Sequence, residues 1–179
     1  MFNKLLIANR GEIACRVIRS ARRMGISTVA VFSDADRDAP HTLMADEAVH
    51  IGASASAESY LLVERIVDAC QTTGADAVHP GYGFLSEKSA LVSGLENVGV
   101  AFVGPPATAI EVMGDKIASK ALAESAGVPT IPGFNEVLVD ADDAVSHARQ
   151  IGYPVMLKAS AGGGGKGMRI ATDDNECRE

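Results

Sequence analysis

A glycine-rich segment near the end of the chain has the residue types needed to bind an anion. It reads Ala161-Gly162-Gly163-Gly164-Gly165-Lys166-Gly167, and Lys158 precedes it. Each glycine loses more backbone entropy on folding than alanine would, roughly 1 kcal/mol, so stability does not explain four in succession. They do allow backbone N–H groups to approach a negatively charged ligand closely. We therefore expect a phosphate-binding loop; a hairpin tip without a ligand is the alternative.

The residues after this segment exclude one common kind of phosphate loop. A P-loop needs Ser or Thr directly after Gly-Lys and then a helix, but Gly167 follows Lys166, and residues 168–171 alternate like a strand. The pattern instead predicts two antiparallel strands joined by a glycine-rich turn, an arrangement that can cover nucleotide phosphates. Lys158 falls in the first predicted strand, 155–159, on the same face as Met156.

Lys116 is a second candidate for phosphate binding. Asp115 is suited to cap a helix over 116–126, which places Lys116 in the first turn. A cation is disfavoured there by about 0.3–1 kcal/mol, because the helix dipole is positive at that end. The position is explained if the ammonium group reaches an anion that the helix end also attracts. An ordinary surface lysine is the alternative.

A third candidate is the loop His79-Pro80-Gly81-Tyr82-Gly83-Phe84-Leu85-Ser86-Glu87. It follows a predicted strand, and ligands of open α/β sheets gather beyond the carboxyl ends of strands. Tyr82 lies between two glycines and can offer a flat face to a planar ligand, or it can simply pack on the surface. The turn over residues 9–12 has one glycine, where a dinucleotide fold has Gly-x-Gly-x-x-Gly, so NAD binding is disfavoured. The four histidines show no metal-ligand spacing.

The elements that position these loops alternate between strand and helix. Apolar runs predict strands over 4–8, 28–32, 48–51, 75–79 and 100–103, and helical periodicity lies between them over 13–24, 60–70 and 86–98, with Ser86 as a cap. Such alternation predicts an α/β fold with a parallel, doubly wound sheet. From Gly104-Pro105-Pro106 the pattern changes to helices over 109–113, 116–126 and 140–151, followed by the hairpin. We expect a boundary between residues 1–114 and 115–179, and a chain that is a fragment.

Composition excludes several classes of protein. The 179 residues carry a net charge of −7, which argues against binding to nucleic acid or an anionic membrane. Three distant cysteines do not form a disulfide scaffold, and no apolar run reaches the roughly 18 residues of a membrane span. We expect a cytoplasmic protein. The first predicted helix carries Arg16, Arg19 and Arg23 opposite its apolar face, which predicts either a solvated surface or a subunit contact.

Together these motifs resemble the N-terminal part of the biotin carboxylase family. The resemblance covers essentially the whole chain in order and spacing, and rests on residues 7–14 (Ile-Ala-Asn-Arg-Gly-Glu-Ile-Ala), 79–87, 113–116 and 158–167. The glycine-rich segment alone would indicate only the wider ATP-grasp superfamily. Residues 14–18, 44–50 and 151–156 are most similar to the biotin-carrying α subunits of bacterial acyl-CoA carboxylases, those specific for propionyl-CoA above all.

This resemblance implies a pre-ATP-grasp, Rossmann-like domain followed by the start of an ATP-grasp lid. The family makes carboxyphosphate from bicarbonate and MgATP, and then carboxylates N1 of biotin on a carrier domain. It implies that Tyr82 and Gly83 lie near the biotin and bicarbonate pocket, and that Arg16, Arg19 and Arg23 face the second subunit of a homodimer. The implied ATP-binding residues are Lys116, Lys158, Gly162, Gly163, Gly164, Gly165, Lys166, Gly167 and Met168.

The resemblance also implies what lies outside these residues. The family's magnesium-binding carboxylates and its bicarbonate-binding arginine and glutamate come later than residue 179, so we expect no metal ligand and no turnover from these residues alone. A carboxyltransferase subunit is the further implied partner. Two alternatives remain open: another ATP-grasp ligase, such as a carbamoyl-phosphate synthetase-like enzyme, and a non-catalytic nucleotide-binding or assembly module.

Overall fold

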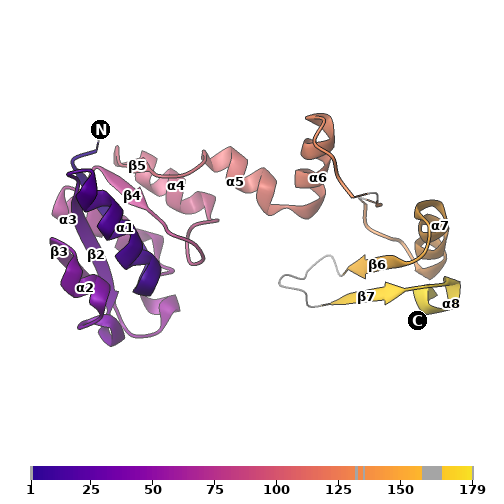
Figure 1. Ribbon diagram of the computed structural model, residues 1–179, viewed down its shortest axis with the longest axis horizontal. Coiled ribbons are helices and arrows are strands. Elements are labelled where there is room, and N and C mark those ends of the chain that lie inside the picture. Colours follow the sequence, from indigo (N-terminus) through magenta and orange to yellow (C-terminus); the bar gives the residue numbers. More distant parts are fainter. Residues whose placement is uncertain (1, 132, 135, 159–166, 179) are drawn as a thin grey trace. The chain divides into compact units, whose positions relative to one another are not determined.

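The computed structural model describes residues 2–131, 133–134, 136–158 and 167–178 (Figure 1). The chain divides into two compact units, Met1–Gly114 and Asp115–Glu179. Each unit has its own sheet, with five strands in the first and two in the second. The two units are therefore described separately.

The first unit is built on a parallel sheet with the strand order β3-β2-β1-β4-β5. Every neighbouring pair of these strands is parallel, which confirms the predicted doubly wound α/β fold. The strands are β1 (Lys4–Ile7), β2 (Ser27–Ser33), β3 (Glu47–Gly52), β4 (Ala77–His79) and β5 (Ala101–Phe102).

Helices cover both faces of this sheet because apolar side chains point alternately to the two sides. Leu5 and Ile7 pack against α1 (Gly11–Arg23), which Figure 1 shows crossing in front of the strands. Leu6 and Ala8 face the opposite way and join a second core cluster with α3 (Val63–Thr73) and α4 (Ser89–Glu96). The remaining helices of the unit are α2 (Pro40–Met44), α5 (Ala107–Gly114) and two short 3₁₀ turns, η1 (Asp34–Asp36) and η2 (Ser56–Glu58).

Two predicted helix starts are wrong. The helix predicted from Tyr60 begins at Val63, because Tyr60 lies in a turn and its side chain enters the core. The helix predicted from Ser86 begins at Ser89, because the preceding residues form turns of their own. In these turns the Ser86 backbone N–H bonds the Gly83 carbonyl at 2.9 Å, and the Lys88 N–H bonds the Leu85 carbonyl at 3.1 Å.

The second unit contains the predicted hairpin, β6 (Val155–Lys158) and β7 (Met168–Ala171), which pair in antiparallel register. Val155 and Ala171 pack with α7 (Ala141–Ile151) and α8 (Asp174–Arg178) in a small core. The predicted N-cap Asp115 is observed, and the helix predicted from Asp140 has that residue as its N-cap. The cap predicted at Ser86 in the first unit is wrong, because Lys88 precedes the first residue of α4. Asp140 accepts a hydrogen bond from the Asp143 N–H in α7, and Asp115 caps α6 (Lys116–Ser125).

Cys15, Cys70 and Cys177 are free and buried. Within the described ranges, no helix combines the length and the apolar character needed to cross a bilayer.

Candidate functional site

Two loops meet where the strand order of the first sheet reverses. Strands β2 and β3 follow β1 towards one edge of the sheet, and β5 follows β4 towards the other edge. The reversal therefore lies between the neighbouring strands β1 and β4. Open α/β sheets bind their ligands at such a point, beyond the carboxyl ends of the strands. The loop after β1 carries Asn9 and Arg10, and the loop after β4 carries Tyr82 and Gly83.

Asn9 ties these two loops together. Its side-chain amide donates to the Pro80 carbonyl at 2.9 Å and to the Tyr82 carbonyl at 2.8 Å, and its side-chain oxygen accepts the Arg10 backbone N–H at 2.9 Å. Asn9 is only 4% exposed. A buried amide with all these partners is costly to disturb, because removing it leaves two carbonyls without a donor. Asn9 therefore fixes the backbone path of residues 80–82.

The start of the β4 loop needs a glycine at position 81. Gly81 has a φ of +66°, and a Cβ atom there would lie 2.8 Å from the Asn9 side-chain nitrogen. The Gly81 N–H donates to His79 Nδ1 at 3.0 Å, so the neutral His79 ring carries its proton on Nε2. Burial lowers the pKa of His79 below 6.5, and the positive charge of Arg16 adds to this effect. Both influences favour the neutral form that this hydrogen bond requires.

Tyr82 and Gly83 lie at the exposed part of the loop. Tyr82 is 60% exposed, and its hydroxyl hydrogen-bonds Glu12 in the first turn of α1, which raises the pKa of Tyr82 above 10.0. Gly83 has a φ of +67°. Gly83 and Phe84 line two surface hollows; the first also includes Ser86, Glu87, Lys88, Ser89, Ala90, Ile110, Glu111 and Gly114, and the second Asn9, Arg10, Gly11, Glu12, Ile13 and Tyr82.

In the second unit, the structure brings Lys158 and Met168 together. They are cross-strand partners at the end of the hairpin from which the glycine-rich segment extends, and both are exposed. Gly167 beside them has a φ of +70°, a conformation that favours glycine. The predicted phosphate-loop residues Gly162, Gly163, Gly164, Gly165 and Lys166 lie outside the described residues.

Lys116 is the first residue of α6. The capping carboxylate of Asp115 accepts the backbone N–H groups of Ile117 at 2.9 Å and Ala118 at 2.7 Å. The Lys116 side chain itself lies outside the described part of the chain. That Lys116 and Lys158 contact the same phosphate chain therefore stays a prediction.

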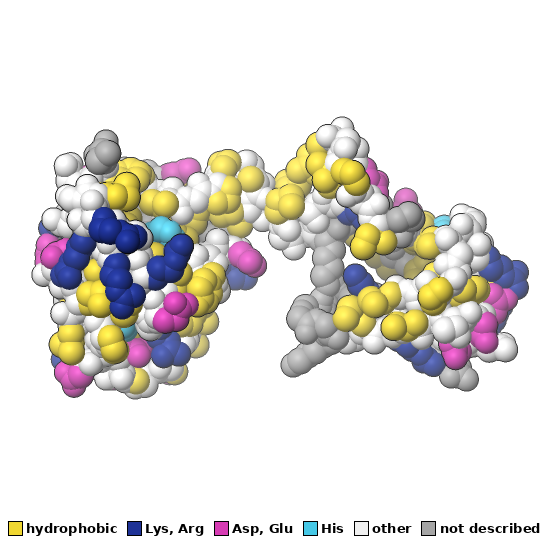
Figure 2. All heavy atoms as spheres, viewed as in Figure 1, with side chains coloured by type: hydrophobic (Ala, Val, Ile, Leu, Met, Phe, Trp, Pro, Cys, Tyr) yellow, Lys and Arg dark blue, Asp and Glu magenta, His cyan; other side chains and the backbone are white. Residues whose placement is uncertain are grey.

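The basic face of α1 comprises Arg16, Arg19 and Arg23, all exposed. Figure 2 shows dark blue side chains gathered over this helix. In the part of the chain that the structure describes, Arg16 and Arg19 form no hydrogen bond or ion pair, whereas Arg22 bonds the Met44 carbonyl and pairs with Asp46 at 3.4 Å. Arg23 donates to the Ser20 hydroxyl at 3.4 Å. Exposed guanidinium groups of this kind are suited to an acidic or polar partner.

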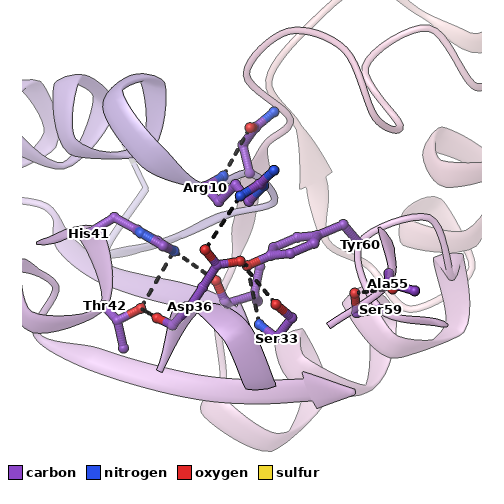
Figure 3. Close-up of polar contacts among 10 residues, drawn as sticks. Arg10, Ser33, Asp36, His41, Thr42, Ala55, Ser59 and Tyr60 are labelled. Carbon is purple, nitrogen blue, oxygen red and sulfur yellow. Dashed lines mark hydrogen bonds and ion pairs between the residues drawn. The ribbon is translucent and has the colours of Figure 1, made fainter. Parts of the chain in front are cut away.

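The sequence did not reveal which residues hold the β4 loop in place through hydrogen bonds and ring contacts. Asn9, Asp36 and Tyr60 are the main ones, and Figure 3 draws the last two with Arg10. A polar residue directly after a buried strand could have pointed to Asn9. No local pattern marks Tyr60, because its partners are distant in sequence. Among the described residues, no group of three or more His, Cys, Asp or Glu side chains is arranged to hold a metal ion.

Comparison with known proteins places both units in established families. Residues 1–110 match the family model of the biotin carboxylase N-terminal domain, and residues 115–179 match that of the carbamoyl-phosphate synthase L chain ATP-binding domain. The propionyl-CoA carboxylase alpha chain of Ruegeria pomeroyi is 64% identical over 179 residues, which are all of this chain and 26% of the relative. The chain thus spans about a quarter of the length of that relative.

Solved structures give the same assignment. The biotin carboxylase domain of Hydrogenobacter thermophilus 2-oxoglutarate carboxylase, solved as a dimer with MgADP, ADP and bicarbonate, is 51% identical with a TM-score of 0.88. The biotin carboxylase of Campylobacter jejuni, solved in complex with β-γ-ATP, is 43% identical with a TM-score of 0.91. The matches cover 99% of this chain, and 39% and 40% of the solved chains. With its first 110 residues matching the biotin carboxylase N-terminal domain, the chain belongs to the biotin carboxylase family.

Proposed function

We propose that the intact protein containing this chain uses ATP and bicarbonate to carboxylate biotin on a carrier domain. We infer further that it is the α subunit of an acyl-CoA carboxylase acting on propionyl-CoA, with a separate carboxyltransferase subunit as its partner. The observation that carries this proposal is the 64% identity to a propionyl-CoA carboxylase alpha chain, which extends over the full 179 residues. The three free, buried cysteines suit a reducing compartment, and we propose the cytoplasm.

Nucleotide binding is assigned to the second unit. Lys158 is exposed and is the cross-strand partner of Met168, next to a glycine in the left-handed conformation, and this combination of a cation, an apolar side chain and a glycine fits a ligand with phosphates and a planar base. We propose that Lys158, Lys116 and residues 162–168 hold ATP. ATP supplies the phosphoryl group that activates bicarbonate, and Mg²⁺ neutralises part of its charge. The two lysines position the phosphates and oppose the charge that develops during transfer.

Biotin and bicarbonate binding is assigned to the first unit. We propose that Tyr82 and Gly83 contact these substrates, since they lie at the switch point and both line one surface hollow, while Gly83 also lines a second. Asn9 and Gly81 hold the loop in a fixed path before a ligand arrives. Such preorganisation lowers the entropy lost on binding and keeps the reacting atoms in place.

The test is ATP hydrolysis by the intact protein, measured with and without bicarbonate and free biotin. We expect hydrolysis to depend on bicarbonate and to be stimulated by biotin. Lys116→Ala and Lys158→Ala should each lower the rate by about 10²-fold, as expected for removing a charge-stabilising group. Lys120→Ala is the matched control, because Lys120 lies one turn further along α6 and bonds the Gly133 carbonyl; its rate should stay close to that of the wild type.

The alternatives predict different results. Another ATP-grasp ligase would need the same lysines, but biotin would not stimulate its ATPase. A non-catalytic assembly module would keep its function in both lysine variants. To test the acyl-CoA substrate, the purified complex is given labelled bicarbonate with propionyl-CoA or acetyl-CoA. Label should enter propionyl-CoA preferentially, and equal labelling of both would overturn the finer assignment.

We also propose that Arg16, Arg19 and Arg23 form part of a homodimer contact. Charge reversal by Arg19→Glu should weaken the dimer of the intact protein in analytical ultracentrifugation, because repulsion replaces attraction at the contact. Arg65→Glu is the control, since Arg65 lies on α3, which covers the opposite face of the sheet. Equal dissociation constants for the two variants would place the dimer contact elsewhere.

A further inference from the structure

A partly buried carboxylate lies just after the carboxyl end of β2. One oxygen of Asp36 accepts the Tyr60 hydroxyl at 2.7 Å and the Ser33 hydroxyl at 2.9 Å, and the other pairs with Arg10 at 3.4 Å (Figure 3). The Asp36 side chain is only 14% exposed. Burial alone would raise its pKa, but the bonds from Tyr60 and Ser33 and the charge of Arg10 lower it below 3.8. Asp36 is therefore an ionised anchor with several partners.

Tyr60 connects Asp36 to the β4 loop, because its hydroxyl bonds Asp36 and its ring contacts Phe84. Tyr60 is 2% exposed, and its ring stacks on the Phe84 ring, with the centroids 5.0 Å apart and the planes inclined by 5°. The Arg10 guanidinium carbon lies 6.0 Å from the centroid of each ring. The Tyr60 hydroxyl also accepts the Ser33 backbone N–H at 3.1 Å, so the ring is fixed at its polar end as well as on its face.

Phe84 has a backbone conformation that needs such support. Its φ is +41°, and it is the only non-glycine residue with a positive φ among those the structure describes. A bulky residue in that region costs about 1–3 kcal/mol and persists only when its surroundings hold it there. Phe84 directly follows Tyr82 and Gly83, so its conformation fixes the carboxyl end of this two-residue segment.

We propose that Asp36 and Tyr60 are positioning residues for biotin or bicarbonate binding, acting through Phe84 on the Tyr82–Gly83 segment. This inference rests on the proposed function of that segment. Neither residue is expected to touch substrate. Asp36 orients Tyr60, the Tyr60 ring holds Phe84 at its positive φ, and Phe84 keeps Gly83 and Tyr82 on the path that Asn9 begins.

The role predicts a graded and selective kinetic effect. Tyr60→Phe keeps the stacked ring and removes only the hydroxyl, so we expect the KM for free biotin to rise by about threefold. Tyr60→Leu removes the stacked ring as well. We expect it to raise the KM for free biotin by about tenfold or more, because a binding group that is no longer held in place binds its ligand less well. The KM for ATP should stay unchanged in both, because the proposed ATP residues lie in the other unit.

The experiment measures kcat and the three KM values of the intact protein with ATP, bicarbonate and free biotin. The variants are Tyr60→Phe, Tyr60→Leu and Asp36→Asn. Phe32→Leu is the matched control, since Phe32 is a buried aromatic residue whose ring contacts are His50 and Arg37 rather than the loop. Phe32→Leu should lower the thermal midpoint while leaving the KM for biotin and for bicarbonate at the wild-type values.

The outcomes separate this inference from the proposed function. A wild-type protein without bicarbonate-dependent ATPase would overturn the proposed function and this inference with it. If the wild type is active but the Tyr60 variants lose only kcat, or shift every KM equally, Tyr60 has a purely structural role and the inference is wrong. Should Tyr60→Leu fail to fold, Tyr60→Phe and Asp36→Asn, which retain the ring, decide the question by the same KM comparison.

Discussion

Both units consist of strands and helices, but they bury their apolar side chains to different extents. In the first unit, helices cover both faces of a five-stranded sheet, and Leu6, Ile18 and Ile66 are completely buried. In the second, α7 and α8 cover one face of a two-stranded hairpin, whereas Met156 and Ile170 on the other face are 49% and 61% exposed. Since apolar burial is the main source of stability, the first unit should hold its site rigidly and the second should unfold locally first.

The largest expected effect tests this difference in core burial. Ile18→Ala in α1 should lower the free energy of unfolding by about 2–5 kcal/mol, because it leaves a cavity at a fully buried position. Ile170→Ala on the exposed hairpin face should change it by less than about 0.5 kcal/mol. Urea unfolding of the intact protein, with hydrogen exchange read separately for peptides of residues 1–114 and 115–179, measures both. Similar losses from the two variants would remove the distinction between the units.

Gly81→Ala tests whether the switch-point loop is held as tightly as its contacts indicate. The new Cβ would clash with Asn9 in addition to straining a φ of +66°, so we expect a loss of about 1–3 kcal/mol and weaker biotin stimulation of the ATPase. Gly74→Ala is the matched control, because its φ is +68° and nothing lies within 4 Å of the added carbon. It should cost about 1 kcal/mol from backbone strain alone. Equal costs would mean that the Asn9 contact is loose.

The helix cap of α7 gives a smaller effect within the second unit. Asp140→Ala removes the acceptor for the Asp143 N–H, which lies at 2.8 Å, and should cost about 1 kcal/mol. Asp140→Asn keeps a capping oxygen and should restore most of that stability. Hydrogen exchange should increase in peptides from residues 141–151 and stay unchanged in residues 1–114. A uniform increase along the chain would show that the units unfold together.

Acid should weaken the first unit gradually, and we expect this effect to be the smallest. Burial is the main cause that lowers the pKa values of His41 and His79 below 6.5. Because the unfolded chain takes up these protons at a higher pH, the contribution to stability is complete above pH 6.5. It is lost as the pH falls towards the folded-state values.

Urea midpoints between pH 8 and pH 5 measure this loss. His79→Asn keeps an acceptor for the Gly81 N–H but cannot take up a proton, so its midpoint should depend less on pH than that of the wild type. Identical slopes would exclude His79 as a contributor.

Features determined by neighbouring residues could be predicted from the sequence. Alternating apolar residues predicted the strand at 168–171 with the bounds that the structure has, and Asp115 predicted the cap of α6. The helix start at Tyr60 was wrong because apolar periodicity runs through Leu61 and Leu62, while the Asp36 carboxylate, 24 positions earlier, holds the Tyr60 side chain in the core. A pattern of neighbouring residues does not indicate a hydrogen-bond partner that lies so far away in the sequence.

In the candidate site, too, features set by neighbouring residues could be predicted, whereas features set by distant residues could not. The loop over 79–87 could be predicted because its glycines and aromatic residues follow a strand. Its anchoring by Asn9 could not, because the Asn9–Pro80 bond joins residues 71 positions apart. The positive φ of Phe84 likewise depends on its stack with Tyr60, which only the folded arrangement creates.

The contact between Asn9 and the β4 loop has a consequence for evolution. Among the described residues, the hydrogen bonds from the Asn9 side chain to this loop go to main-chain carbonyls, those of Pro80 and Tyr82. The side chain at position 82 can thus be exchanged without loosening these bonds. A descendant protein could acquire a new ligand preference there by a single codon change, while the scaffold beneath remains as inherited.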